Sequence, residues 1–240
     1  MLKEILFVII QVIANTIQAI TGFAGGPLAM PPSMALVGVN EAKASITLIL
    51  WIVTMIVTLQ NIKFINPKKL GIMVGLMVVG MVPGMWLFSI LPTKILMVVY
   101  GVIVVIIGLY KYFAKNSKDL EPPFNYIALL ASGLMQGMFT SGGPFLALYA
   151  TTAIKDKKEF RATVSAVWAI LNIYMIFNMY QNEMYNPYVF KLTGISMIPV
   201  FFAIFIGNKI NKYIKQETFL KLVYILLIIS GAILLFNAFS

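Results

Sequence analysis

The sequence Gly-Gly-Pro occurs twice, and both copies interrupt a long apolar stretch of the chain. The first copy lies within Gln18–Pro32 (QAITGFAGGPLAMPP), and the second lies within Gln136–Tyr149 (QGMFTSGGPFLALY). Such breaks are costly inside a bilayer, because the freed backbone groups have no water to bond, and they are tolerated where they face protein or a polar cavity. A matching pair of Gly/Pro-interrupted segments in two halves of a chain is typical of a transporter's binding site.

The composition is that of an integral membrane protein, with 60% hydrophobic and only 11% charged residues among 240. Several charge-free runs have about the length of a membrane-spanning α-helix, and examples are Leu70–Leu91, Ile95–Tyr110, Ala162–Asn182 and Leu222–Ser240. The apolar run after Lys3 shows no small-residue cleavage site and leads directly into the first break, so we expect an uncleaved first helix. The sequence therefore predicts an all-α integral membrane protein.

The remaining composition excludes several classes of function. The net charge of +10 does not indicate nucleic-acid binding, because Lys and Arg cluster in short loops as the positive-inside rule expects. The absence of Cys and His excludes disulfides, imidazole metal sites and histidine proton carriers. No Walker sequence and no nucleophile–base pair is present, so we expect no enzyme activity, no metal and no cofactor. All eight carboxylates lie in or beside loops, which leaves the coupling ion unidentified.

The two halves of the chain share residues in the same order, which predicts an internal duplication. The Gly-Gly-Pro copies are 117 residues apart, and five further matches follow at offsets of 120 to 124. These are Ala42 with Ala162, Ser45 with Ser165, Asn66-Pro67 with Asn186-Pro187, Leu96 with Leu220, and Tyr100 with Tyr224. We predict a first repeat over residues 1–114, a cytoplasmic linker over 115–123 and a second repeat over 124–240.

Most of the 18 basic residues fall in four loop clusters that the positive-inside rule places in the cytoplasm. The clusters are Lys63, Lys68 and Lys69; Lys111, Lys115 and Lys118; Lys155, Lys157, Lys158 and Arg161; and Lys209, Lys212, Lys215 and Lys221. Because the linker and the Lys155 cluster then share one side, Phe124–Ile154 has to enter the membrane and return, turning near Gly142-Gly143. By repeat symmetry, Glu4–Val37 turns near Gly25-Gly26.

Each half is then one broken or re-entrant hairpin plus three transmembrane helices, with eight to ten helical segments in the chain. Three crossings after each hairpin invert the two repeats relative to each other and place both termini outside the cytoplasm. Leu28–Val37 is about half a crossing long, so the two hairpin tips are expected to meet near the midplane. An arrangement of four plus four simple spans is the alternative, and it places the Lys155 and Lys209 clusters outside.

The breaks predict an anion site between two helix N-termini. Pro27 and Pro144 are expected to open helices, and the N–H groups of the glycines before them are expected to be free and to face the cavity. Such N–H groups, with the partial positive charge of the helix end, bind anions. Close helix packing by small residues is the alternative. The predicted substrate-binding residues are Gln18, Thr21, Gly22, Gly25, Gly26, Gln136, Thr140, Ser141, Gly142, Gly143, Trp51 and Trp168.

Four more polar residues stand in or beside apolar runs. Asn15 and Asn172 are expected to make interhelical hydrogen bonds. Lys43 and Arg161 open the spans after the two hairpins, and we expect their charged heads to reach the membrane interface. Arg161 is also a candidate for attracting an anionic substrate.

The two Gly-Gly-Pro motifs, each followed by a loop and by the span openings Ala42–Ser45 and Arg161–Ser165, resemble the TauE/SafE family of sulfite exporters. The resemblance covers essentially the whole chain. It implies transport of sulfur-containing anions such as sulfite or sulfoacetate, other sulfonates or related organic acids. Family members often carry Gly-Gly-Gly where this chain has Gly-Gly-Pro, so the resemblance does not assign sulfite itself.

The sequence thus predicts a secondary transporter, most simply an exporter, that moves a small anion by alternating access. An uncoupled anion facilitator and a membrane scaffold subunit are the alternatives. The expected partners are the small anion and the lipid bilayer, without nucleic acid, and a homo-oligomer is left open. The expected location is the inner membrane of a prokaryotic cell, as a multi-pass protein.

Overall fold

The structure, a computed structural model, describes residues 2–113 and 124–211, residue 213 and parts of 224–239. The chain is helical because only a helix satisfies its own backbone groups in lipid. Its helices are α1 (Leu2–Thr21), α2 (Gly25–Val37), α3 (Val39–Gln60), the 3-10 turn η1 (Ile62–Phe64), α4 (Pro67–Ile90), α5 (Thr93–Phe113), α6 (Phe124–Phe139), α7 (Gly143–Ala153), α8 (Lys157–Gln181) and α9 (Pro187–Asn211). Helical residues also occur in the described parts of 224–239.

The helices have the lengths of an integral membrane protein. Among the described residues, α1, α3, α4, α8 and α9 are long and apolar enough to cross a bilayer. Large apolar side chains are exposed along the outer faces, for example Phe202 and Phe205 on α9 and Trp86 on α4. Such a surface is stable in contact with lipid, so the predicted all-α membrane fold is confirmed.

Each Gly-Gly-Pro break separates a longer helix from a short one, at the positions predicted from the sequence. Helices α2 and α7 contain 13 and 11 residues, which makes them about 20 and about 17 Å long at 1.5 Å per residue. Neither reaches the ~30 Å thickness of the hydrocarbon core. The pairs α1–α2 and α6–α7 are therefore hairpins in which the second limb is re-entrant.

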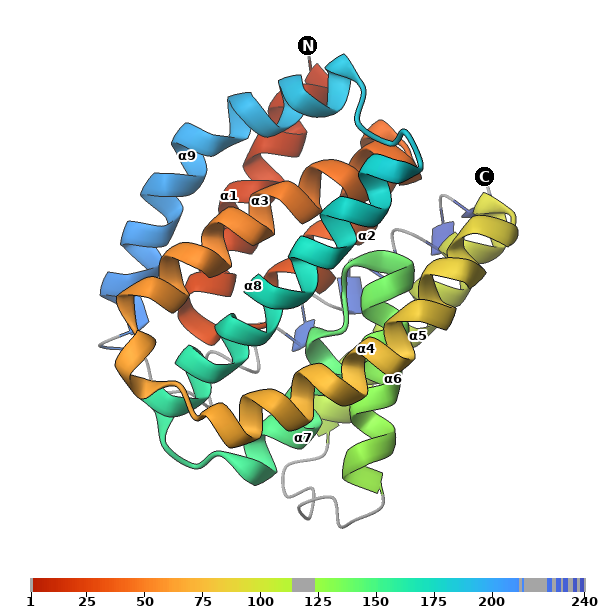
Figure 1. The fold of residues 1–240 in the computed structure, drawn as a ribbon. Coiled ribbons are helices and arrows are strands. Elements are labelled where there is room, and N and C mark those ends of the chain that lie inside the picture. Colours follow the sequence, from red (N-terminus) through yellow and green to blue (C-terminus); the bar gives the residue numbers. More distant parts are fainter. Residues whose placement is uncertain are drawn as a thin grey trace.

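The helices of the two halves pack in an exchanged pattern. Helix α1 lies against α9, α4 lies against α6, and α3 and α8 pack against each other between these pairs (Figure 1). In the predicted repeats α1 corresponds to α6, α4 to α9 and α3 to α8. The α1–α9 pair is therefore equivalent to the α6–α4 pair, and the α3–α8 pair is equivalent to itself. An inverted duplication requires this two-fold pattern.

The basic clusters that contain Lys69, Lys157 and Lys209 lie at one end of the molecule. The ion pair between Lys69 and Glu159 is 2.9 Å long, and Lys157 donates a hydrogen bond of 2.8 Å to the carbonyl of Asn211 at the end of α9. The start of α1 lies beside the start of α9, where Lys191 pairs with Glu4 at 2.7 Å. The four-plus-four alternative, which separates the Lys155 cluster from the Lys63 loop, is therefore wrong.

Some of the residues used in that prediction are not described. The linker 115–123, with Lys115 and Lys118, lies outside the described residues, and so do Lys212, Lys215, Lys221 and Leu220. Which end of the molecule faces the cytoplasm stays a prediction from the charge bias.

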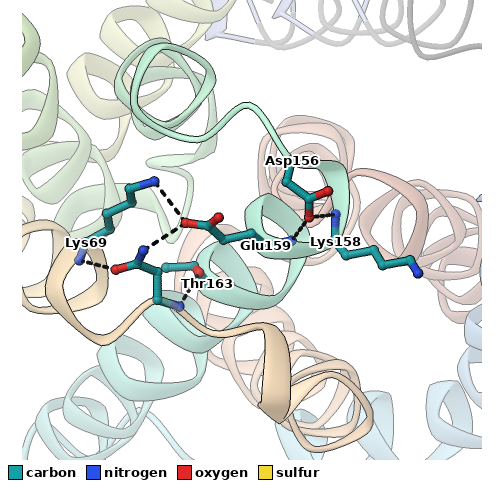
Figure 2. A network of polar contacts seen from close by, with 6 residues as sticks. Lys69, Asp156, Lys158, Glu159 and Thr163 are labelled. Carbon is teal, nitrogen blue, oxygen red and sulfur yellow. Dashed lines mark hydrogen bonds and ion pairs between the residues drawn. The ribbon is translucent and has the colours of Figure 1, made fainter.

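A polar network joins the η1–α4 turn to the start of α8 (Figure 2). Glu159 accepts hydrogen bonds of 2.9 Å from both Lys69 Nζ and Asn66 Nδ2. Asn66 caps α4 by accepting from the Lys69 N–H, and its own N–H donates to the Thr163 hydroxyl at 3.0 Å. Asp156 caps α8 through the N–H groups of Lys158 and Glu159. The network fixes the start of α4 onto α8.

Replacing Glu159 by glutamine is expected to weaken this junction only modestly. The change removes the charge that Lys69 pairs with, but both side chains of this pair are about 30% exposed, and exposed ion pairs contribute about 1 kcal/mol or less. We expect Glu159→Gln to lower the melting temperature by ~2–4 °C in low salt, with a smaller loss in high salt. Glu183→Gln, an exposed change in the α8–α9 turn, is the control, and an equal loss in both variants would contradict the assignment.

Candidate functional site

The two breaks lie directly against each other. A Cβ atom added to Gly143 would stand 2.0 Å from the carbonyl oxygen of Phe23, and one added to Gly26 would stand 2.4 Å from the carbonyl oxygen of Thr140. Each glycine thus lets the backbone of the opposite break approach to van der Waals contact. The expectation that the two tips meet is confirmed, and at both contacts any side chain would force them apart.

A small chamber lies where the breaks meet. Its volume is about 10 Å³, which is about the space that one water molecule needs. Both hairpins and the central helices α3 and α8 line it, and no lining residue carries a charge. The lining residues are Gln18, Phe23, Gly26, Pro27, Leu50, Thr54, Gln136, Thr140, Gly143, Trp168 and Asn172.

Two buried glutamines hold the breaks in shape. Gln18 Oε1 accepts a hydrogen bond of 2.8 Å from the Gly25 N–H, and Gln136 Oε1 accepts one of 3.3 Å from the Gly142 N–H. The expectation that these two glycine N–H groups would be free is therefore wrong, because the chain's own amides satisfy them. No hydrogen bond joins the N–H of Gly26 or Gly143 to another described residue.

The amide nitrogens of the same glutamines have different partners. Gln18 Nε2 donates to the Gly22 carbonyl at 3.0 Å and so bridges the first break internally. Gln136 Nε2 donates to Asn172 Oδ1 on α8 at 2.8 Å, which confirms the interhelical hydrogen bond expected for Asn172. Asn15, in contrast, bonds to Gln11 of its own helix. The second hairpin is thus tied to the central helix pair through its glutamine.

The predicted hydroxyl groups are not equivalent. Thr21 is used within the first break, where its Oγ1 accepts from the N–H groups of Phe23 and Ala24 at 3.3 Å. Ser141 bonds to the hydroxyl of the buried Tyr100 on α5. Thr140 lines the chamber, and its hydroxyl lies 2.9 Å from that of Thr47 on α3. Of the three predicted hydroxyl residues, only Thr140 lines the chamber.

Thr140 also has an unusual backbone conformation. Its φ is +53°, and Gly22, the corresponding first residue after α1, has φ +86°. Glycine adopts this left-handed region freely, whereas a β-branched residue is strained there, by roughly 1–2 kcal/mol. Thr140 therefore places a hydroxyl group in the second break in a strained conformation, and such strain is common among residues at functional sites.

The two tryptophans do not occupy matching places. Trp168 lines the chamber, whereas Trp51 does not and Leu50 does. The contact between Thr47 and Thr140 has an equivalent in the other half, between Ser165 and Gly22. The Ser165 Oγ would lie 3.7 Å from a Cβ atom added to Gly22. This pairing corresponds to an offset of 118, two residues less than the offset of 120 predicted for α3 and α8.

The sequence prediction missed several lining residues, chiefly Leu50 and Thr54 on α3. Thr47, Leu50 and Thr54 recur at helical spacing, so they share one face of α3. Thr47 and Thr54, two hydroxyl residues seven apart on one face of the span, were the available signal. Phe23 and Pro27 line the chamber simply because they flank the glycines.

Comparison with known proteins gives two matches. The model of the family described as Sulfite exporter TauE/SafE matches residues 7–234. A curated relative, the probable inner membrane transporter protein TsaS of Comamonas testosteroni, is 21% identical over 176 residues, which cover 71% of this chain and 73% of the relative. No solved structure gives a significant match.

Proposed function

The chain belongs to the TauE/SafE sulfite exporter family and is a membrane transporter, and on that premise we propose that it moves small anions by alternating access. The proposed substrates are sulfite, sulfonates or related organic acids, and the proposed direction is export across a prokaryotic inner membrane. The termini are then extracytoplasmic. The chamber between the two Gly-Gly-Pro breaks is the proposed binding site.

The single observation that carries the proposal is the meeting of two helix N-termini at one uncharged chamber. Helices α2 and α7 begin at Gly25 and Gly143, and the N–H groups of Gly26 and Gly143 have no hydrogen-bond partner among the described residues. Helix N-termini carry a partial positive charge and bind anions through such groups. Two facing N-termini can hold an anion without a fixed charge that would trap it.

The size of the chamber supports a gated carrier over an open pore. At about 10 Å³ it is too small for a sulfite or carboxylate ion, so binding requires the breaks to separate. The four contacting hairpin limbs are the elements that would move. No carboxylate lines the chamber, which favours coupling by a means other than a carboxylate proton relay at this site.

A binding screen tests the proposal. The purified full-length protein would be heated with sulfite, sulfate, sulfoacetate, taurine, acetate and lactate, and its melting temperature compared with that of the protein alone. We expect a concentration-dependent rise with at least one sulfur oxyanion or sulfonate, because a ligand that binds the folded state stabilises it. The binding anion would then be followed into liposomes, where saturable flux is expected. Flux that rises linearly with concentration would instead indicate a facilitator.

Gln136→Glu locates the site. The change is nearly isosteric and keeps the acceptor for Gly142, but it places a negative charge in the chamber beside the proposed anion. Like charges a few ångströms apart repel by several kcal/mol in a partly dry site, so the affinity for sulfite or sulfoacetate is expected to fall by ~100-fold or more. Gln60→Glu adds the same charge at the exposed end of α3 and is expected to bind normally.

The outcomes separate the alternatives. Equal anion affinity in Gln136→Glu and wild type would remove the chamber from the proposal. No stabilisation of well-folded wild type by any anion would overturn anion transport and favour the scaffold alternative.

A further inference from the structure

A second cavity opens at the ends of α4 and α8, whereas the polar network of Figure 2 lies at the starts of the same two helices. This vestibule has a volume of about 530 Å³ and lies between the start of α3, the ends of α4 and α8 and the start of α5. Its lining includes the polar side chains Asn40, Ser89, Asn178 and Asn182 and one cation, Lys43. The vestibule is far larger than the chamber at the breaks, whose volume is about 10 Å³.

Lys43 lies buried in the lining of the vestibule, with only 3% of its surface exposed. Its Nζ donates a hydrogen bond of 2.8 Å to the carbonyl of Gly137 and lies 3.3 Å from the centre of the Phe88 ring. No carboxylate pairs with it among the described residues. The expectation that its head would reach the membrane interface is therefore wrong. A buried charge without an opposite charge is costly, which indicates a role other than packing.

The position of Lys43 connects the vestibule with the chamber. Gly137 belongs to the last turn of α6, directly before the second break. One turn along α3, Thr47 bonds to the carbonyl of Lys43 at 2.7 Å and to the chamber-lining hydroxyl of Thr140 at 2.9 Å. The ammonium group thus lies on the vestibule side of the break, and Thr47 and Thr140 lie between it and the chamber.

The first hairpin has a corresponding cation. At the offset of 118 that relates α3 to α8, Lys43 corresponds to Arg161. The Arg161 guanidinium donates to Asn208 of α9, while its Nε is buried without a hydrogen-bond partner among the described residues. Phe88, whose ring contacts the Lys43 ammonium, and Asn208, which accepts from the Arg161 guanidinium, are 120 residues apart. Each break is therefore flanked by one cation, at opposite ends of the molecule.

We infer that Lys43 forms a second anion site at the floor of the vestibule, separate from the chamber at the breaks. It would take the oxyanion group of a small carboxylate, sulfite or sulfonate. One N–H of the ammonium is used by Gly137, which leaves two donors for the anion, and hydrogen bonds from an ammonium to an oxyanion are charge-assisted. The amides of Asn40 and Asn178 add neutral donors. This inference rests on the proposed function in one respect, the anionic nature of the substrate.

The test compares Lys43→Met with Lys94→Met in the full-length protein. Methionine matches the length of the lysine stem without its charge. It also removes the donor to the Gly137 carbonyl, which Lys43→Arg is expected to keep together with the charge. Lys94 lies at the same end, is exposed and does not line the vestibule. Binding of sulfite and of sulfoacetate would be measured by titration calorimetry, and uptake into liposomes would give KM and the maximal rate.

We expect two anions per chain in wild type, and one in both Lys43→Met and Gln136→Glu. Lys43→Met is expected to raise KM by about 10-fold and to make uptake less sensitive to salt. Lys43→Arg would retain both sites, and Lys94→Met would behave as wild type.

The failures of the two proposals differ. If Lys43→Met binds as many anions as wild type with the same KM, while Gln136→Glu loses binding, the vestibule site is overturned and the chamber site stands. If well-folded wild type binds neither anion, both are overturned.

Discussion

Replacing Gly143 by alanine is expected to abolish anion binding at the chamber and to lower the melting temperature by ~5–10 °C. The new Cβ would stand 2.0 Å from the Phe23 carbonyl oxygen, a backbone atom that cannot rotate away. The two breaks would have to separate, and overpacking of this kind costs roughly 1–3 kcal/mol. Residues of both breaks line the chamber, so their separation would change its shape. Thermal melting with and without sulfite measures both effects.

A matched control keeps this prediction specific. Gly194→Ala on α9 makes the same chemical change where no atom lies within 4 Å of the added Cβ. It is expected to leave binding intact and to shift the melting temperature by no more than about 2 °C. If Gly143→Ala melts and binds as the control does, the breaks do not meet as described.

The reciprocal contact gives a sharper form of the same experiment. Gly26→Ala meets the Thr140 carbonyl at 2.4 Å and should resemble Gly143→Ala. Because either change alone already separates the breaks, the double variant is expected to lose less stability than the sum of the two. Non-additivity of this kind is the signature of residues that share one contact. Full additivity would argue that the two glycines act independently.

The second large effect is expected between α4 and α6. Gly133→Ala would place a Cβ 2.0 Å from the Met77 carbonyl oxygen, and Gly80 meets the Leu130 carbonyl at 2.1 Å in the opposite direction. Gly84 and Gly137 make two more contacts of the same kind, so each helix presents glycines four residues apart. Small residues at this spacing let membrane helices approach closely. We expect Gly133→Ala to lower the melting temperature by ~5–10 °C, and Gly133→Leu to prevent assembly.

Gly75→Ala is the control for this pair. It lies on α4 itself, but no atom lies within 4 Å of the added Cβ. Alanine favours the helix over glycine by up to ~1 kcal/mol, so the variant is expected to melt at the wild-type temperature or slightly above it. Equal melting of Gly133→Ala and Gly75→Ala would contradict the close approach of α4 and α6.

The hairpins could be predicted from the sequence because charge and length act over whole segments. Lys69 and Lys158 are basic residues of two clusters that have to share a side of the membrane, and the stretches between these clusters fix how often the chain can cross. The conclusion depends on no single residue. For that reason the observed packing of α1 on α9 and of α4 on α6 agrees with the repeat that a few residue matches predicted.

The site was predicted less fully, because it depends on register. The two glutamines are 118 residues apart and the glycines 117, since the second break is one residue shorter. Matching Ala42 with Ala162 by type then shifted α3 against α8 by two residues, and a shift of two positions turns a helix by more than half a revolution. Trp51 was expected in the chamber because it lies 117 residues before Trp168, whereas the observed offset of 118 places Leu50 there. Burial of Lys43 follows from tertiary packing, which the local sequence does not encode.

Four glycines bring α4 and α6 close together, and the corresponding pair, α1 and α9, has fewer such contacts. There a single close approach occurs, where Gly207 faces the Thr16 carbonyl at a would-be Cβ distance of 2.7 Å. A carrier whose two halves were identical would spend equal time open to either side of the membrane. Unequal halves give the two orientations unequal free energies. Under the proposed alternating-access mechanism, we expect these unequal helix pairs to bias the resting orientation, and we expect a change at Gly80 to alter the kinetics in one direction of transport more than in the other.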